Sequence, residues 1–239
     1  PYNIAYCFFK ERNYQSAVKW FTEYLDQPQV KYRKEALERK ADCHFISKHY
    51  KTAADAYALV MEDYFNANDV YPYYQAALSY GLSKQPEKKI EALTNVLDAS
   101  PEAEFYPEAL FELGRAYTLN DDDENAFSCF RKLADTVKDS TFVARAYIEM
   151  GSLARNQSQY NEALGYYKTV VEEMPLSGYM EDALAAIESI YQTRNEPEEY
   201  LAYIEAIGKG EIKSDGEREN MIFNSAEQIY LSENYQKAL

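Results

Sequence analysis

The chain has 239 residues, of which 46% are hydrophobic, and its 25 basic and 40 acidic side chains give a formal net charge of −15. That balance argues against nucleic-acid binding, which depends on Lys and Arg neutralising phosphates, and against adhesion to an anionic lipid surface. No apolar run approaches the roughly 20 residues that a membrane-spanning helix needs, and only 8 glycines and 8 prolines are present, which is typical of a helical protein.

A small residue recurs along the chain with an almost constant period. Successive copies are 36 or 37 residues apart as far as Gly151, and Ala226 follows two periods later with Glu188 at the intermediate position. A fixed period of this length indicates a solenoid, in which each repeat buries its apolar face only against its neighbours. The small residues are Ala5, Ala41, Ala77, Gly114, Gly151 and Ala226.

Two further positions repeat in step with the small residue. An alanine lies twelve residues after it, and a large, mostly aromatic side chain lies sixteen residues after it. The pattern predicts a helical hairpin, because a first helix needs a small residue where the second helix crosses it closely. The alanines are Ala17, Ala53, Ala126, Ala163 and Ala238, and the large residues are Phe21, Tyr57, Leu93, Phe130, Tyr167 and Ile204.

In chain order, the period predicts a single array of hairpins over residues 1–30, 31–66, 67–103, 104–140, 141–177 and 178–207. The third repeat departs from the pattern: Pro86 lies nine residues after the small residue, where other copies have Tyr14, Tyr50, Tyr160 and Tyr235, and Lys89 replaces the alanine. The sixth departs further, at Glu188, Pro197 and Tyr200. Residues 208–216 are expected to form a connector, and residues 217–239 part of a seventh repeat. Neither end carries the polar cap that a solenoid needs, so we expect a fragment of a longer protein.

These recurring positions resemble the tetratricopeptide repeat (TPR). The most complete copy consists of Gly151, Tyr160, Ala163, Tyr167 and Pro175. The resemblance extends over the whole chain, as six hairpins and the start of a seventh. It implies an all-α fold, a right-handed superhelical α-solenoid of helix–turn–helix repeats.

The resemblance also implies a binding groove. In TPR proteins, a concave groove is lined by first-helix positions three before, one after and four after the small residue. Tyr2, Glu38 and Tyr74 lie where chaperone-binding TPR domains begin their Lys/Asn/Arg clamp, so capture of chaperone tails is not expected. Arg145 lies one helical turn before the groove position Ile148 and is expected to join it. The residues expected to contact a partner are Tyr6, Phe9, Phe45, Tyr74, Leu78, Phe111, Arg115, Arg145, Ile148 and Arg155.

No group of residues predicts catalysis, a metal site or a cofactor. His44 and His49 are too few for structural zinc, which needs four converging ligands. The acidic run 121–124 lacks the spacing of a calcium loop and suits a helix N-terminus. Cys7 and Cys43 occupy equivalent positions in adjacent repeats, roughly 8–10 Å apart and beyond the reach of a disulfide. We therefore expect these two thiols and Cys129 to be unpaired and buried.

The sequence accordingly predicts a non-catalytic scaffold that binds a protein or peptide partner. Two alternatives stay open: a carbohydrate-binding or glycan-uptake accessory module, whose aromatic rings would stack on sugars, and a regulatory domain of a larger enzyme. The proline-ended joints at residues 98–101 and 173–175 resemble those of multi-TPR proteins of the Gram-negative cell envelope, associated with Tol–Pal systems and outer-membrane assembly. That resemblance implies a periplasmic or outer-membrane-associated protein, with the cytoplasm as the alternative.

Overall fold

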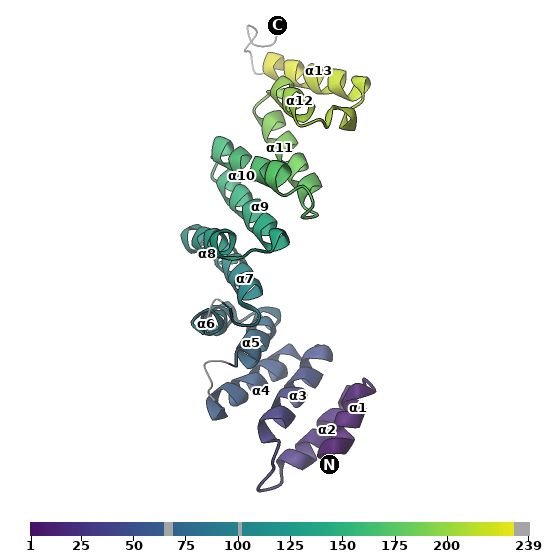
Figure 1. The fold of residues 1–239 in the computed structure, drawn as a ribbon, viewed down its shortest axis with the longest axis vertical. Coiled ribbons are helices and arrows are strands. Elements are labelled where there is room, and N and C mark those ends of the chain that lie inside the picture. Colours follow the sequence, from purple (N-terminus) through teal and green to yellow (C-terminus); the bar gives the residue numbers. More distant parts are fainter. Residues whose placement is uncertain (65–68, 100–101, 232–239) are drawn as a thin grey trace. The chain divides into compact units, whose positions relative to one another are not determined.

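The computed structural model describes residues 1–64, 69–99 and 102–231 (Figure 1). Within these ranges the elements are helices with no strand, so the predicted all-α class is confirmed. Residues 100–101 and 232–239, with the predicted repeat position at Ala238, lie outside the described residues. The helices are α1 (Tyr2–Lys10), α2 (Tyr14–Leu25), α3 (Arg33–Ile46), α4 (Tyr50–Asp63), α5 (Tyr71–Leu82), α6 (Pro86–Leu97), α7 (Tyr106–Leu119), α8 (Asp123–Thr136), α9 (Ser140–Asn156), α10 (Tyr160–Glu173), α11 (Met180–Thr193), α12 (Pro197–Ala206), η1 (Gly210–Ile212) and α13 (Asp215–Leu231).

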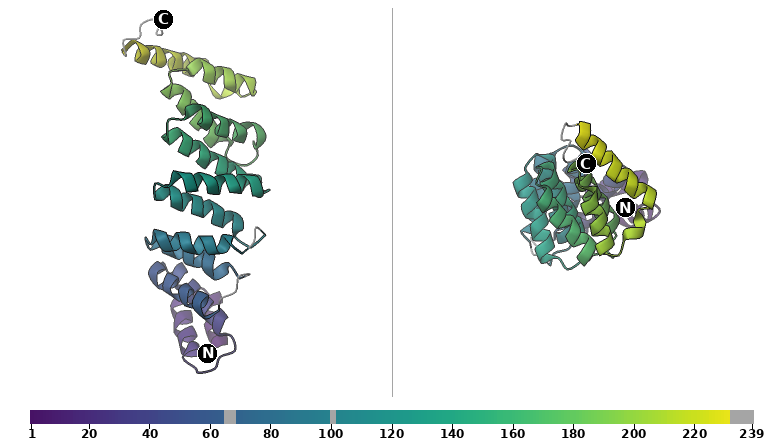
Figure 2. Two further views of the ribbon diagram at one scale, coloured as in Figure 1. Left: turned by 90° about the vertical axis from the view of Figure 1, so that its left-hand side faces the viewer. Right: turned by 90° about the horizontal axis from the view of Figure 1, so that it is seen from above.

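The chain forms two compact units, the first comprising Pro1–Lys132 and the second beginning at Leu133. In the first unit, each helix from α1 to α6 packs against the next one in the chain. The same order holds in the second unit, where α9 packs on α10, α10 on α11, α11 on α12 and α12 on α13. Figure 2 shows these successive antiparallel hairpins from a second direction. Packing between chain neighbours is the arrangement expected of a repeat array.

The close helix crossings lie where the period placed them. A Cβ atom added to Gly114 would lie 2.6 Å from the Phe130 ring, and one added to Gly151 would lie 2.7 Å from the Tyr167 ring. Real Cβ atoms do not approach so closely, and both rings are fully or almost fully buried. The predicted pairing of a small residue with a large one sixteen positions later is therefore confirmed in both repeats.

Each turn between the two helices of a hairpin uses a left-handed residue that is not glycine. These residues lie seven positions after the small residue, and their φ angles are between 53° and 63°. The residue that follows donates its backbone N–H to a carbonyl five residues earlier, at 2.8–3.0 Å, which closes the end of the first helix. The left-handed residues are Arg12, Lys48, Lys84, Asp121, Ser158 and Asn195.

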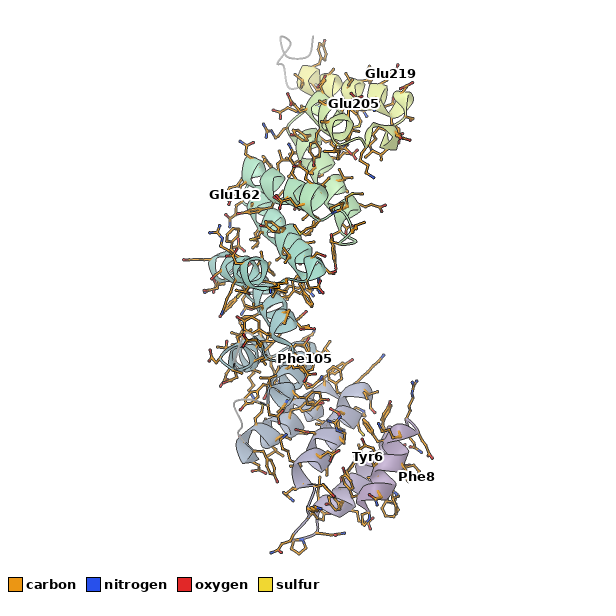
Figure 3. All side chains as sticks on the ribbon, viewed as in Figure 1. Tyr6, Phe8, Phe105, Glu162, Glu205 and Glu219 are labelled. Carbon is orange, nitrogen blue, oxygen red and sulfur yellow. The ribbon has the colours of Figure 1, made fainter. Side chains whose placement is uncertain are left out.

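The predicted connector contains a turn of 3₁₀ helix, η1, and α13 begins at Asp215, before the predicted connector ends. Arg218 holds this segment in place. Its guanidinium donates to the carbonyl oxygens of Gly210 at 2.6 Å and Lys213 at 3.1 Å, and to the carboxylate of Glu205 at 2.5 Å. Figure 3 labels Glu205 on the helix that precedes this turn.

The three cysteines are free. Cys43 is buried, whereas Cys129 is half-buried. The prediction that all three thiols are buried is therefore confirmed for Cys43, met only in part by Cys129, and wrong for Cys7, which is exposed.

Candidate functional site

The expected groove positions of the first repeat form a row of aromatic rings on α1. Tyr6 lies between Tyr2, at a centroid distance of 6.1 Å, and Phe9, at 6.2 Å, and Figure 3 labels it. All three rings are half-buried. Tyr2 also stacks on Tyr32 at 5.0 Å, so part of this aromatic surface is already covered within the chain.

In the second repeat, two of the expected groove positions hold acids that are buried and paired. Asp42 accepts hydrogen bonds from the hydroxyls of Tyr57 and Tyr71, and pairs with Arg39. Glu38 forms an ion pair of 2.7 Å with Lys34. Lys34 also pairs with Asp69, which lies 35 residues further along the chain. Because these carboxylates have partners, their burial is compensated. Asp42 thereby joins α3 to α4 and α5, and both acids offer little surface to a ligand.

Tyr74, on α5, is covered by another aromatic ring. Phe105, just before α7, lies parallel to it at a centroid distance of 4.7 Å and an interplanar angle of 5°. Phe105 has a φ of 64°, an uncommon conformation for a bulky residue. Phe111 is only 4% exposed and packs on Phe130 at 5.8 Å. Phe111 therefore exposes little surface, whereas Tyr74 is half-buried with another ring stacked on it, and the role of both residues as partner contacts stays a prediction.

Phe45 and Leu78, by contrast, line a hollow of about 460 Å³ in the first unit. Its walls come from three successive first helices, α3, α5 and α7, and from α6 together with the turn that leads into it. Leu82 and Leu119, the last residues of α5 and α7, remain 53% and 78% exposed at this hollow, which we call the repeat-three pocket. Its lining residues are Phe45, Leu78, Gly81, Leu82, Lys84, Pro86, Lys89, Glu112, Ala116, Leu119 and Asn120.

The pocket lies where the third repeat departs from the pattern. Pro86 stands where other repeats carry a tyrosine, so a large ring is missing from the wall. Lys89 replaces the usual alanine, and its ammonium group forms an ion pair of 2.7 Å with Glu112 of α7. Gly81 accommodates the lysine stem, because a Cβ there would lie 3.1 Å from the Lys89 Cδ atom. The two departures thus produce a hollow with apolar walls and a polar edge.

The remaining expected groove residues lie outside the pocket. Arg115, in the first unit, has a half-exposed side chain and approaches Glu112 at 3.5 Å. In the second unit, Arg145 lies over the Phe142 ring at 5.7 Å, and Ile148 packs against the apolar core of that unit. Arg155, in the last turn of α9, is half-buried. These second-unit residues stay predictions as partner contacts.

The groups considered for chemistry have structural roles. Burial raises the pKa of Cys43 to about 12 and that of Cys129 to about 11, which disfavours the nucleophilic thiolate. Burial lowers the pKa of His44, whose ring lies 6.2 Å from that of His49. Asp122 accepts the backbone N–H of Asn125 at 3.2 Å and caps α8, as the sequence predicts for the acidic run. Among the described residues, no cluster of His, Cys, Asp or Glu could hold a metal ion.

The comparisons with known proteins agree with this architecture. Residues 108–140 match the tetratricopeptide repeat family. A tetratricopeptide repeat protein from Parabacteroides merdae has a TM-score of 0.63 at 16% identity, over 98% of this chain and 86% of that one. A MamA protein has a TM-score of 0.62 at 16% identity, over 71% and 87%. MamA from Desulfovibrio magneticus RS-1 has a TM-score of 0.58 at 18% identity, over 71% and 90%.

At these identities the solved structures show the fold alone: a TPR-like array of helical hairpins. A comparison with curated proteins finds no match. None of the described helices combines the length and the apolar character that crossing a membrane requires. The TPR resemblance of the sequence is therefore supported, directly for residues 108–140 and at the level of fold for the chain.

Proposed function

We propose that this chain is a non-catalytic scaffold that binds a segment of a protein partner, and that the repeat-three pocket anchors that segment. The observation that carries the proposal is the pocket itself. It combines two exposed leucines with a hollow of about 460 Å³, within the 300–1,000 Å³ that is usual for binding sites. Apolar side chains left exposed around a hollow are typical of interaction sites.

The fold supports the same function. Helical repeat arrays present extended surfaces on which a partner segment can lie, with apolar pockets for its side chains. The pocket also draws its walls from three repeats, so a segment that fills it contacts several hairpins at once. The predicted envelope location is a further part of this proposal. It rests on the joints between repeats, and fractionation of cells that make the full-length protein checks it.

A comparison of captured proteins tests the binding function. The wild-type chain and the double variant Leu82→Gln/Leu119→Gln are immobilised and exposed to the same cell extract. We expect a partner that the wild type retains and the double variant loses, because two polar amides replace the exposed apolar rim. Both leucines are more than half exposed, so the exchange should leave the fold intact.

The matched control is Leu59→Gln/Leu176→Gln, since these leucines are 51% and 97% exposed and lie outside the pocket. The control should retain the partner. Identical sets of proteins on all three columns would contradict a role for the pocket. Retention that disappears after enzymatic removal of glycans would instead favour the carbohydrate-binding alternative.

A further inference from the structure

The charges around the repeat-three pocket differ from those of the chain as a whole. Three cationic side chains lie at or beside it: Lys84 and Lys89 in the lining, and Arg115 next to the lining residue Glu112. Glu112 is the one carboxylate of the lining, and it is already paired with Lys89 at 2.7 Å. The charged residues of the lining, two lysines and one glutamate, therefore give it a net charge of +1 in a chain of net charge −15, and the acidic residues 121–123 follow the lining residue Asn120.

Lys84 is the cation best placed to meet a ligand. It occupies the left-handed turn between α5 and α6, with a φ of 60°, and this residue is exposed. Within the part of the chain that the structure describes, it has no ion pair. An exposed cation beside an apolar hollow attracts a negative group on whatever fills the hollow, and this attraction contributes to specificity and to the rate of association.

The apolar part of the surface is confined to a few repeats. Five residues after the small residue, the second, third and fourth repeats carry exposed aliphatic side chains: Ile46, Leu82 and Leu119. At the same position, the first, fifth and sixth repeats carry Lys10, Asn156 and Thr193. Exposed aliphatic side chains at this position are therefore restricted to three consecutive repeats and are not present in every repeat.

From this combination we infer that the occupant of the pocket is an acidic protein segment. It inserts one large apolar side chain between Leu78, Leu82 and Leu119, and it places an Asp or Glu against Lys84. The volume of about 460 Å³ accommodates a Leu, Met, Phe or Trp side chain. This inference specifies the partner of the proposed function and rests on it.

Selection from a displayed library of random peptides tests the inference. Peptides that bind the wild-type chain are kept, and those that also bind Leu82→Gln/Leu119→Gln are removed. The expected survivors contain a large apolar residue with Asp or Glu within one helical turn. Synthetic copies of them should bind more weakly as salt is raised from about 20 to about 300 mM, because salt screens exposed charges.

The charge is tested on the chain with Lys84→Glu and its matched control, Lys48→Glu. Lys48 occupies the same left-handed position in the second repeat and is also exposed, but it does not line the pocket. Fluorescence anisotropy should show binding weakened roughly three- to tenfold by Lys84→Glu and less than about twofold by Lys48→Glu.

The two ideas fail in different ways. Selected peptides that need the leucines but show no preference for acids, or that bind Lys84→Glu as well as the wild type, would overturn the acidic partner and leave the scaffold function standing. If no peptide distinguishes the wild type from the leucine variant, both ideas are contradicted. Peptides enriched in Lys or Arg would overturn the acidic partner alone.

Discussion

Gly151 and Gly165 are both helical glycines, but they lie in opposite surroundings. A Cβ atom on Gly151 would lie 2.7 Å from the buried Tyr167 ring, whose hydroxyl is held by Ser152 at 3.1 Å. A Cβ atom on Gly165 would meet no atom within 4 Å. The same substitution should therefore change stability in opposite directions at the two sites.

We expect Gly151→Ala to destabilise the chain by about 1–3 kcal/mol, the usual cost of overpacking a core. Gly165→Ala should stabilise it by about 0.5–1 kcal/mol, since alanine is the better helix former. Thermal unfolding followed by circular dichroism checks both. Equal melting temperatures for the two variants would show that the helices do not cross closely at Gly151.

At the scale of the element, the left-handed turns store a small backbone cost in every hairpin. An L-residue with a side chain pays about 1–2 kcal/mol in this conformation, whereas glycine does not. Lys48, with a φ of 63°, is exposed and terminates α3. We expect Lys48→Gly to stabilise the chain by about 0.5–1 kcal/mol, part of the gain being offset by the greater freedom of glycine in the unfolded chain.

Lys19→Gly is the matched control for this turn. Lys19 is an exposed lysine inside α2, so the change in charge is the same, but glycine in a helix interior should cost about 1 kcal/mol. Urea unfolding of the two variants should give shifts of opposite sign. A loss of stability in Lys48→Gly would mean that the lysine side chain makes a contact that matters more than the backbone strain.

At the scale of the whole molecule, the sequence predicts the hairpins because their determinants are local and repeated. A small residue and a large residue sixteen positions later, as in Gly114 and Phe130, identify each crossing from the period alone. The left-handed turns were not predicted, since Arg, Lys and Ser are not the residues that usually signal that conformation. The period locates each turn but does not show its geometry.

The pocket and the buried acids could not be predicted for a different reason. Glu38 and Asp42 lie at groove positions of the family register, but the register does not show that Asp42 accepts a hydrogen bond from Tyr71 of the next repeat, or that Lys34 links Glu38 to Asp69. The pocket likewise needs side chains from three hairpins. Pro86 and Lys89 were recognised as departures, and only their placement beside Gly81 and Glu112 shows that they open a hollow.

Each of the two units has its own apolar core, so a substitution that disrupts one core is expected to destabilise the helices of that unit and not those of the other. One core lies in the second unit between Ala144 and Ile204, and others lie in the first unit. In a repeat array, stability is the sum of terms for each repeat and its nearest neighbours. We therefore expect Gly151→Leu to speed amide hydrogen exchange in α9, α10 and α11, while α1 to α5 keep their wild-type protection.

Gly165→Leu is the control, because the same side chain enters open space on the next helix and should leave exchange in both units unchanged. Hydrogen exchange followed by mass spectrometry separates the units, since peptides from α1–α5 and from α9–α11 do not overlap. Faster exchange in every helix of the Gly151→Leu variant would mean that the chain opens as one cooperative body. Such a result would also make the first-unit pocket sensitive to damage anywhere in the array.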